Sequence, residues 1–182
     1  KKIAPRLLER FGPVEPEKID LSRAACRGEA GAPATLLVYS DFQCPFCALG
    51  KRLVIELEKK AGKRLRVCFK NWPLSKIHPL ALGAAQAAVA AQLQGKFWEM
   101  HDLMFDNRQA LERSDLLDHA RELGLDVARF DKDMDSPEVA ARIELDIKEA
   151  KGMRLNGTPA FLVNGRRFTD PKSPDDFMDW IA

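Results

Sequence analysis

The fold is decided by residues 34–47, which read Ala-Thr-Leu-Leu-Val-Tyr-Ser-Asp-Phe-Gln-Cys-Pro-Phe-Cys. The first six form a continuous apolar run of strand-forming residues, which is typical of a strand buried on both faces. Pro45 then stands where the first turn of a helix tolerates its missing N–H, and leucines recur every four residues from Leu49 until Gly62 ends the pattern. The stretch therefore predicts a buried strand that leads into a helix with Cys44 at its N-terminus.

The segments on either side predict a mixed α/β protein. Residues 64–70 have the composition of a second central strand, and residues 18–21 predict a short strand earlier in the chain. From about residue 79 to residue 151 the apolar periodicity is helical, with a helix cap expected at Ser114. A helical block of this length between two parts of a sheet indicates an insertion.

The last part of the chain predicts a hairpin and a closing helix. Asn164-Gly165 is a strong signal for a two-residue turn between strands at 159–163 and 166–169. Ser173-Pro174 then combines a cap with a first-turn proline. Three apolar side chains of this helix are expected to face inward: Phe177, Trp180 and Ile181.

The order of these elements, with Cys-x-x-Cys at the start of the first helix, is that of a thioredoxin-like fold. We therefore predict an α/β, thioredoxin-like fold with an inserted all-helical subdomain at about residues 75–151. Residues 1–16 hold three prolines and mixed charges and are predicted to be an N-terminal lead-in. Residues 17–182 would form the domain itself, since a chain of 182 residues suits one compact unit.

The composition excludes several kinds of partner. Lys and Arg number 29 against 27 Asp and Glu, a net charge of +2, so no overall field favours nucleic acid or an anionic membrane. The longest apolar run, around residues 81–91, is far shorter than the ~20 residues that cross a bilayer. Residues 1–10 are basic but lack the apolar region and cleavage site of a secretory signal. We expect either a cytosolic chain or one whose targeting segment has been removed.

The chemistry is predicted to reside in Cys44 and Cys47. A thiol is a nucleophile only as the thiolate, and a helix N-terminus lowers its pKa because free N–H groups and the helix dipole favour the anion. Cys44 has that position, and Cys47, one turn later, can resolve a mixed disulfide formed at Cys44. Pro45 stiffens the turn and Phe46 adds an apolar wall. The pair predicts two-electron thiol–disulfide exchange, with the Cys44–Cys47 disulfide as the redox group and no other cofactor.

A zinc site or a structural disulfide is the alternative for these two cysteines. Zinc would need two further ligands with suitable spacing, and the histidines do not have it: His78, His101 and His119. A structural disulfide would not need the preceding buried strand and the helix start. We therefore predict no metal and a redox role.

Thr158 and Pro159 are predicted to bind substrate. A proline at the start of a strand can be cis, which leaves the preceding backbone unpaired to meet an extended peptide. An ordinary trans proline that begins a strand is the alternative, and the residues alone leave both open.

Cys26 and Cys68 stand outside the motif. Cys68 falls in a predicted central strand and Cys26 in the loop after the first strand, so the two can form a structural disulfide if those strands are neighbours. The alternative is a buried free Cys68 and an exposed free Cys26. Neither arrangement makes these cysteines catalytic.

Four ordered motifs resemble the DsbA-like thiol-disulfide oxidoreductases of bacteria, in the branch with Ser-Asp-Phe-x-Cys-Pro-Phe/Tyr-Cys. They are residues 38–47, 69–74 (Phe-Lys-Asn-Trp-Pro-Leu), 95–102 (Gly-Lys-Phe-Trp-Glu-Met-His-Asp) and 156–165 (Asn-Gly-Thr-Pro-Ala-Phe-Leu-Val-Asn-Gly). The resemblance implies a thioredoxin fold with an inserted helical subdomain, a cis Pro159 and Cys44 as the attacking thiol. It also implies a periplasmic or otherwise extracytoplasmic setting, and reoxidation by a membrane partner of the DsbB or vitamin-K-epoxide-reductase-like type.

Some positions depart from the family pattern. Many thioredoxins and DsbA proteins have a buried acid six residues before the first cysteine, and Val38 occupies that position here. Asp41 is expected to be exposed on the loop, and Lys70 on the adjacent strand is a weaker candidate for tuning the cysteines. Phe46 replaces the histidine that stabilises the thiolate in DsbA itself, so a strongly oxidising potential does not follow.

We expect a monomeric thiol:disulfide oxidoreductase that acts on reduced or partly folded extracytoplasmic proteins and does not bind nucleic acid. Cys44 attacks or is attacked, and Cys47 resolves. Two alternatives stay open from the sequence. One is a disulfide isomerase or reductase on the same site, and the other is a non-redox DsbA-fold module for binding or glutathione transfer, as in kappa-type transferases.

Overall fold

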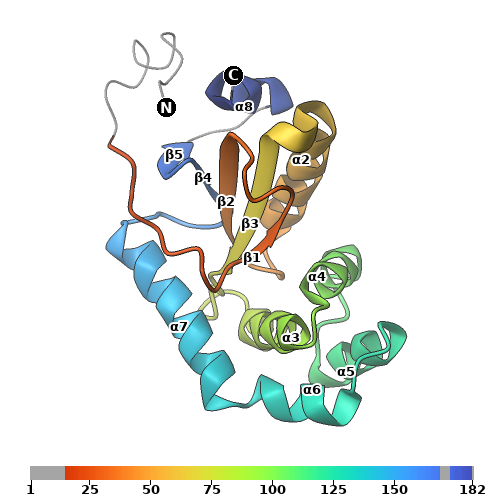
Figure 1. Cartoon of the computed structure of the whole chain (residues 1–182). Helices are drawn as coiled ribbons and strands as arrows, with labels where there is room; N and C mark the ends of the chain where they lie inside the picture. The colour runs from red at the N-terminus through yellow and green to blue at the C-terminus, as the bar shows by residue number, and fades with distance from the viewer. Residues whose placement is uncertain (1–14, 169–172, 182) are drawn as a thin grey trace.

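The computed structural model describes residues 15–168 and 173–181, and the expected lead-in lies almost wholly outside the described residues. Within them, a mixed sheet has the strand order β1-β3-β2-β4-β5 (Figure 1). Its strands are β1 (Ala25–Arg27), β2 (Ala34–Ser40), β3 (Leu65–Asn71), β4 (Ala160–Val163) and β5 (Arg166–Phe168). β2 runs parallel to β3 and antiparallel to β4, so the predicted apolar run is the middle of the sheet.

Helices cover the sheet on both faces. They are α2 (Pro45–Ala61), α3 (Ala81–Leu93), α4 (Phe97–Asp106), α5 (Arg113–Glu122), α6 (Val127–Met134), α7 (Pro137–Gly152) and α8 (Pro174–Ile181). α2 and α8 pack on one face and α7 on the other, while α3 to α6 gather at one end of the sheet (Figure 1). This is a thioredoxin-like fold with an inserted helical block, as predicted. In the part of the chain that the structure describes, no helix is long and apolar enough to cross a membrane.

β2 is buried on both sides because its side chains alternate between two helical layers. Val38 faces α2 and α8 and shares a cluster with Phe177, whereas Leu37 faces α7. Phe177 is fully buried, as predicted. The side chains of Trp180 and Ile181 lie outside the described residues.

The helical block shares a core with the sheet. α3 consists largely of buried alanines, whose small side chains let α4, α6 and α7 approach it closely. Phe42, after β2, and Phe69, in β3, stack with ring centroids 5.3 Å apart. Both belong to the same apolar cluster as Met100 of α4. The insertion is therefore packed against the end of the sheet at which the two cysteines lie.

The first strand lies later in the chain than predicted. Residues 18–21 form no strand; Ile19 and Leu21 instead pack against the face of the sheet that α7 covers. Their apolar alternation reflects packing onto a sheet and not pairing within it. The first strand is β1, and Cys26 lies within it rather than in a following loop.

Caps and turns decide the boundaries of later elements. α5 is capped by Glu112 instead of Ser114, because Glu112 and Asp115 form a reciprocal capping box. Asn164 and Gly165 have φ angles of 49° and 78°, the left-handed pair expected of a two-residue hairpin turn. The predicted hairpin is therefore confirmed over the described residues, which end at 168 in this region.

Cys26 and Cys68 form a disulfide that ties β1 to β3. The two residues lie directly opposite each other in the antiparallel register. Of the two arrangements left open by the sequence, the structure has the bonded one. The bond closes a separation of 42 residues, which includes the segment that carries Cys44 and Cys47.

We predict that Cys26→Ala combined with Cys68→Ala lowers the free energy of unfolding by about 4 kcal/mol, because a cross-link over a loop of this length restricts the unfolded chain by about that amount. Urea unfolding measures the difference, in a background in which Cys44 and Cys47 are both replaced by serine. Dithiothreitol should remove most of the gap, since the reference chain then loses the same bond. A gap that the reductant does not change, or the lack of a linked Cys26–Cys68 peptide in non-reduced protein, would contradict the assignment.

Candidate active site

The two cysteines of the motif lie where β2 ends and α2 begins. Cys44 is the residue before the helix, with φ −69° and ψ 125°, and its side chain caps no backbone N–H. Pro45 is the first residue of the helix, and Cys47 lies one turn into it. Both thiols are free, and the residues are 3 % and 2 % exposed. The pair is therefore a largely buried dithiol at a helix N-terminus.

Asp41 is buried, contrary to the expectation that it is exposed on the loop: only 1 % of the residue is accessible. Its Oδ1 accepts the N–H groups of Gln43 at 2.8 Å and Cys44 at 3.2 Å. Its Oδ2 accepts the N–H of Leu74 at 2.9 Å and lies 2.8 Å from Nδ1 of His78. These donors offset the cost of burying a carboxylate. Asp41 thereby fastens the Cys44 loop to the segment that follows β3.

The surroundings of Cys44 favour its thiolate and lower its pKa to about 5. The largest contribution is the hydrogen bond that the Cys47 thiol donates to it. Partial burial opposes the shift, and the backbone N–H groups of Cys47 and Phe46 at the start of α2 support it. Phe46 has no polar side-chain atom. The thiolate is therefore stabilised without a histidine in the dipeptide.

The surroundings of Cys47 have the opposite effect. Burial raises its pKa above the ordinary value, and the hydrogen bond that it donates to Cys44 adds to the shift. The backbone N–H of Asp41 lies 3.4 Å from the Cys47 sulfur. At neutral pH the reduced pair is therefore a Cys44 thiolate beside a Cys47 thiol, which is the asymmetry that an attacking and a resolving cysteine require.

Thr158 and Pro159 lie beside Cys44. The carbonyl oxygen of Thr158 is 3.5 Å from the Cys44 sulfur, and the Thr158–Pro159 peptide bond is cis. Gly50 of α2 permits this close approach, because a Cβ at that position would lie 3.1 Å from Cγ of Pro159. The Thr158 hydroxyl is buried and has no hydrogen-bond partner among the residues that the structure describes. The fold thus brings the two predicted substrate-binding residues next to Cys44.

Apolar side chains and a groove border the site. Phe46 and Leu49, on the first turns of α2, are 67 % and 59 % exposed although both are large and apolar. A groove of about 360 Å³ runs along the loop between α7 and β4 and includes Thr158 and Pro159. Exposed apolar side chains near a groove are typical of a surface that binds another molecule.

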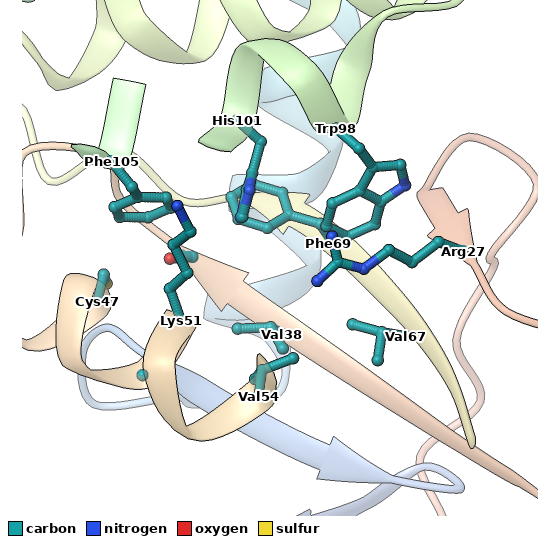
Figure 2. Close-up of a pocket in the computed structure, with 12 residues that line it drawn as sticks. Arg27, Val38, Cys47, Lys51, Val54, Val67, Phe69, Trp98, His101 and Phe105 are labelled. Carbon is teal, nitrogen blue, oxygen red and sulfur yellow. The ribbon is translucent and has the colours of Figure 1, made fainter. Parts of the chain in front are cut away.

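Lys70 is not part of the site. Its ammonium pairs with Glu149 of α7, on the opposite face of the sheet. Alternation along β3 instead directs Phe69 towards the side of Cys47. There Val38, Phe69 and Cys47 line a small cavity together with residues of α4 (Figure 2). Val38 has no carboxylate to offer on this side of the sheet, and Lys70 lies on the opposite side, so neither residue provides an ionisable group beside Cys47.

Sequence comparison places the chain in a known family. The family model described as thioredoxin matches residues 22–182. Among curated proteins, the chain is similar to the Na⁺/H⁺ antiporter NhaA 1 of Mycolicibacterium vanbaalenii, with 40 % identity over 166 residues that make up 90 % of this chain and 26 % of that protein. The chain spans about a quarter of the length of the curated relatives it matches.

Solved structures agree with the observed geometry. The thioredoxin-like oxidoreductase of Silicibacter pomeroyi DSS-3 has a TM-score of 0.79 and 28 % identity, covering 88 % of this chain and 91 % of that one. Oxidised BdbD of Bacillus subtilis has a TM-score of 0.80 and 19 % identity, covering 91 % and 95 %. The fold and the site thus define a thioredoxin-fold protein with a Cys-x-x-Cys pair at a helix start and an inserted helical block. The chain belongs to the thioredoxin family.

We predict that Cys47→Ala raises the pKa of Cys44 from about 5 to above about 6, because the variant removes the hydrogen bond that contributes most to the thiolate. The ultraviolet absorbance of the thiolate, followed against pH in reduced protein, measures this value. The matched control is Cys44→Ala, in which the remaining Cys47 should show no titration below neutral pH. A midpoint that stays at about 5 in Cys47→Ala would mean that another group holds the thiolate.

Proposed function

We propose that the chain is a thiol:disulfide oxidoreductase that donates its Cys44–Cys47 disulfide to reduced or partly folded proteins. The proposal rests on the position of the pair: Cys44 lies at the N-terminus of α2 and Cys47 is buried one turn later, and these surroundings lower the pKa of Cys44 to about 5 and raise the pKa of Cys47. A stable Cys44 thiolate favours the reduced pair, so the oxidised pair tends to give up its disulfide. The direction that this chemistry favours is oxidation of the substrate.

The exchange consists of two displacements. A substrate thiolate attacks the Cys44 sulfur, a mixed disulfide forms and the Cys44–Cys47 bond breaks. The electron pair of that bond goes to Cys47, which takes up a proton because its pKa is raised. A second substrate thiolate then attacks the substrate sulfur of the mixed disulfide and releases Cys44 as its stable thiolate. The substrate loses two electrons, and the reduced pair holds them.

The surroundings of Cys44 support an extended polypeptide as substrate. The loop that carries Thr158 and Pro159 offers backbone atoms beside the Cys44 sulfur, along a groove in which a strand-like peptide can lie. Phe46 and Leu49 add exposed apolar surface. Unfolded chains expose apolar side chains of their own, so these contacts favour proteins that have not finished folding.

The two alternatives from the sequence use the same residues differently. In a disulfide isomerase or reductase, the Cys44 thiolate attacks a substrate disulfide and Cys47 then displaces the substrate. The low pKa of Cys44 makes its sulfur a good leaving group, which favours the oxidase direction instead. A non-redox binding or glutathione-transfer module has no use for a resolving thiol, so the hydrogen bond from Cys47 to Cys44 argues against that role.

The setting of this activity is part of the proposal. A disulfide that oxidises other proteins persists in the periplasm or a comparable extracytoplasmic compartment. We therefore propose that the chain acts in such a compartment. A membrane partner of the DsbB or vitamin-K-epoxide-reductase-like type would return the pair to the disulfide. The relatives named as Na⁺/H⁺ antiporters share about a quarter of their length with this chain. In such proteins, the shared part would supply thiol–disulfide chemistry rather than ion transport.

We predict that Cys44→Ser abolishes oxidation of a reduced, unfolded test protein, because no sulfur remains for the substrate thiolate to attack. Free thiols of the test protein, counted over time with the oxidised chain present, measure the rate. The matched control replaces the other two cysteines, Cys26 and Cys68, by alanine and should keep nearly the full rate. Oxidation by the Cys44→Ser variant at the unaltered rate would show that the activity lies elsewhere.

A further inference from the structure

A small cavity lies beside Cys47, between α2, α4 and the sheet (Figure 2). Its volume of about 20 Å³ is enough for about one water molecule. Cys47 and Lys51 border it from α2, and His101 and Phe105 border it from α4. The buried thiol of Cys47 and the buried imidazole of His101 therefore border the same cavity.

The exchange reaction requires a group that gives a proton to Cys47 when the Cys44–Cys47 bond breaks and accepts it when that bond forms. This thiol must lose its proton whenever it attacks Cys44, and burial makes the loss difficult because it raises the pKa of Cys47.

From β2, the cavity is bordered by Val38, which has no acid, and by Ser40, which offers only a hydroxyl. Lys51 is an ammonium held in ion pairs and has no lone pair to offer. His101 is the base that remains among the side chains bordering the cavity.

The structure keeps His101 ready to accept a proton. Its ring is held among aromatic side chains, with centroids 5.1 Å from Phe69 and 4.9 Å from Phe105. Nδ1 lies 2.9 Å from Oδ1 of Asp102 and donates to that carboxylate, so the lone pair of the neutral ring is on Nε2. In the described part of the chain, Nε2 has no hydrogen-bond partner. Burial lowers the pKa of His101, so the ring is neutral at pH 7.

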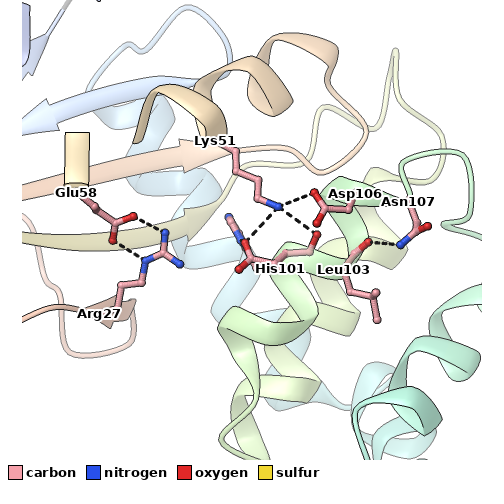
Figure 3. Close-up of polar contacts among 8 residues, drawn as sticks. Arg27, Lys51, Glu58, His101, Leu103, Asp106 and Asn107 are labelled. Atoms are coloured by element: carbon pink, nitrogen blue, oxygen red, sulfur yellow. Dashed lines mark hydrogen bonds and ion pairs between the residues drawn. The ribbon is translucent and has the colours of Figure 1, made fainter. Parts of the chain in front are cut away.

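Charged groups from three elements face this ring. Partial burial opposes ionisation of Asp102, but the hydrogen bond from His101 and the charge of Lys51 outweigh it and lower the pKa of Asp102 to about 2. The carboxylate therefore remains available to stabilise a proton on the ring. Lys51 of α2 and Arg27 of β1 oppose that proton, although Arg27 is paired with Glu58 at 2.6 Å (Figure 3). The residues of β2 and β3 that border the cavity carry no charge.

We propose that His101, through a water molecule in the cavity, accepts the proton of Cys47 when Cys47 attacks Cys44, and returns it in the reverse step. This inference rests on the exchange reaction proposed above. In this attack, which runs opposite to substrate oxidation, the Cys47–Cys44 bond forms, the bond from Cys44 to the substrate sulfur breaks, and that sulfur leaves with the electron pair. The proton passes from Cys47 to Nε2 of His101, and Asp102 stabilises the imidazolium until solvent removes the proton. No external oxidant is needed, because the two electrons stay with the departing sulfur.

Reaction of the reduced chain with DTNB separates the two sulfur attacks. Cys44 attacks the reagent and releases one coloured thiolate, and Cys47 then attacks the mixed disulfide and releases a second. His101→Phe keeps an aromatic ring in the same cluster. In this variant the first release should be unchanged and the second slower by about a hundredfold at neutral pH, the lower end of what a positioned base contributes. The deficit should shrink as the pH rises, since hydroxide then deprotonates Cys47 directly.

The matched control is His119→Phe. His119 is also a buried histidine of the helical block, but its Nε2 lies 3.1 Å from the carbonyl oxygen of Ala110 and it does not border the cavity. This variant should leave both releases unchanged. Circular dichroism shows whether each variant is folded.

A second pair of variants keeps the test open if His101→Phe does not fold. Asp102→Asn leaves the ring in place but removes the carboxylate that stabilises its proton, so the second release should slow while the first is unchanged. Asp106→Asn is its control, because Asp106 pairs with Lys51 and not with His101.

The two possible failures are distinguishable. If His101→Phe folds and its second release keeps its rate and its pH profile, the assignment of His101 is overturned. If His101→Phe does not fold, the same result in Asp102→Asn overturns it. An unaltered chain that ends the reaction without a Cys44–Cys47 bond overturns the proposed exchange reaction instead.

Discussion

The hydrogen bond from the Cys47 thiol to the Cys44 thiolate is the interaction on which the site depends. It contributes most to the low pKa of Cys44, and it adds to the effect of burial in raising the pKa of Cys47. The bond forms because a buried strand ends where α2 begins, which leaves Cys44 at the helix start. Asp41 holds the connecting loop, and Gly50 lets the loop of Pro159 approach the same sulfur. Much of the fold around the site thus serves to place one sulfur atom.

The helical block contributes to the site as well as to the size of the protein. Its α4 helix carries His101, which borders the cavity beside Cys47, and its aromatic neighbours belong to the cluster that joins the block to the sheet. β2 places Val38 at the position where the family pattern has an acid. The base available at that side of Cys47 is therefore an imidazole from the insertion rather than a carboxylate from the sheet.

Predictions from the sequence held where neighbouring residues decide the geometry. The apolar run at 34–39, the helix start at Pro45 and the turn at Asn164-Gly165 all depend on local backbone preferences, and the structure has them as predicted. Predictions failed where distant segments decide. Asp41 is buried because donors from the segment after β3 reach it, and no local pattern marks those donors. Alternation along β3 predicts that Lys70 and Phe69 lie on opposite faces of the sheet. The sequence alone does not show which of these faces holds the cysteines, because that depends on the pairing of β3 with β2.

The equilibrium of the Cys44–Cys47 pair with glutathione measures directly how strongly the oxidised pair acts as an oxidant. The fraction of oxidised pair, trapped by acid across a series of glutathione buffers, gives the reduction potential. We predict a potential less negative than about −200 mV, as expected of a pair whose reduced form is stabilised by a thiolate of low pKa. A value near about −270 mV, the potential of thioredoxin, would contradict the claim that the Cys44 thiolate makes this pair an oxidant.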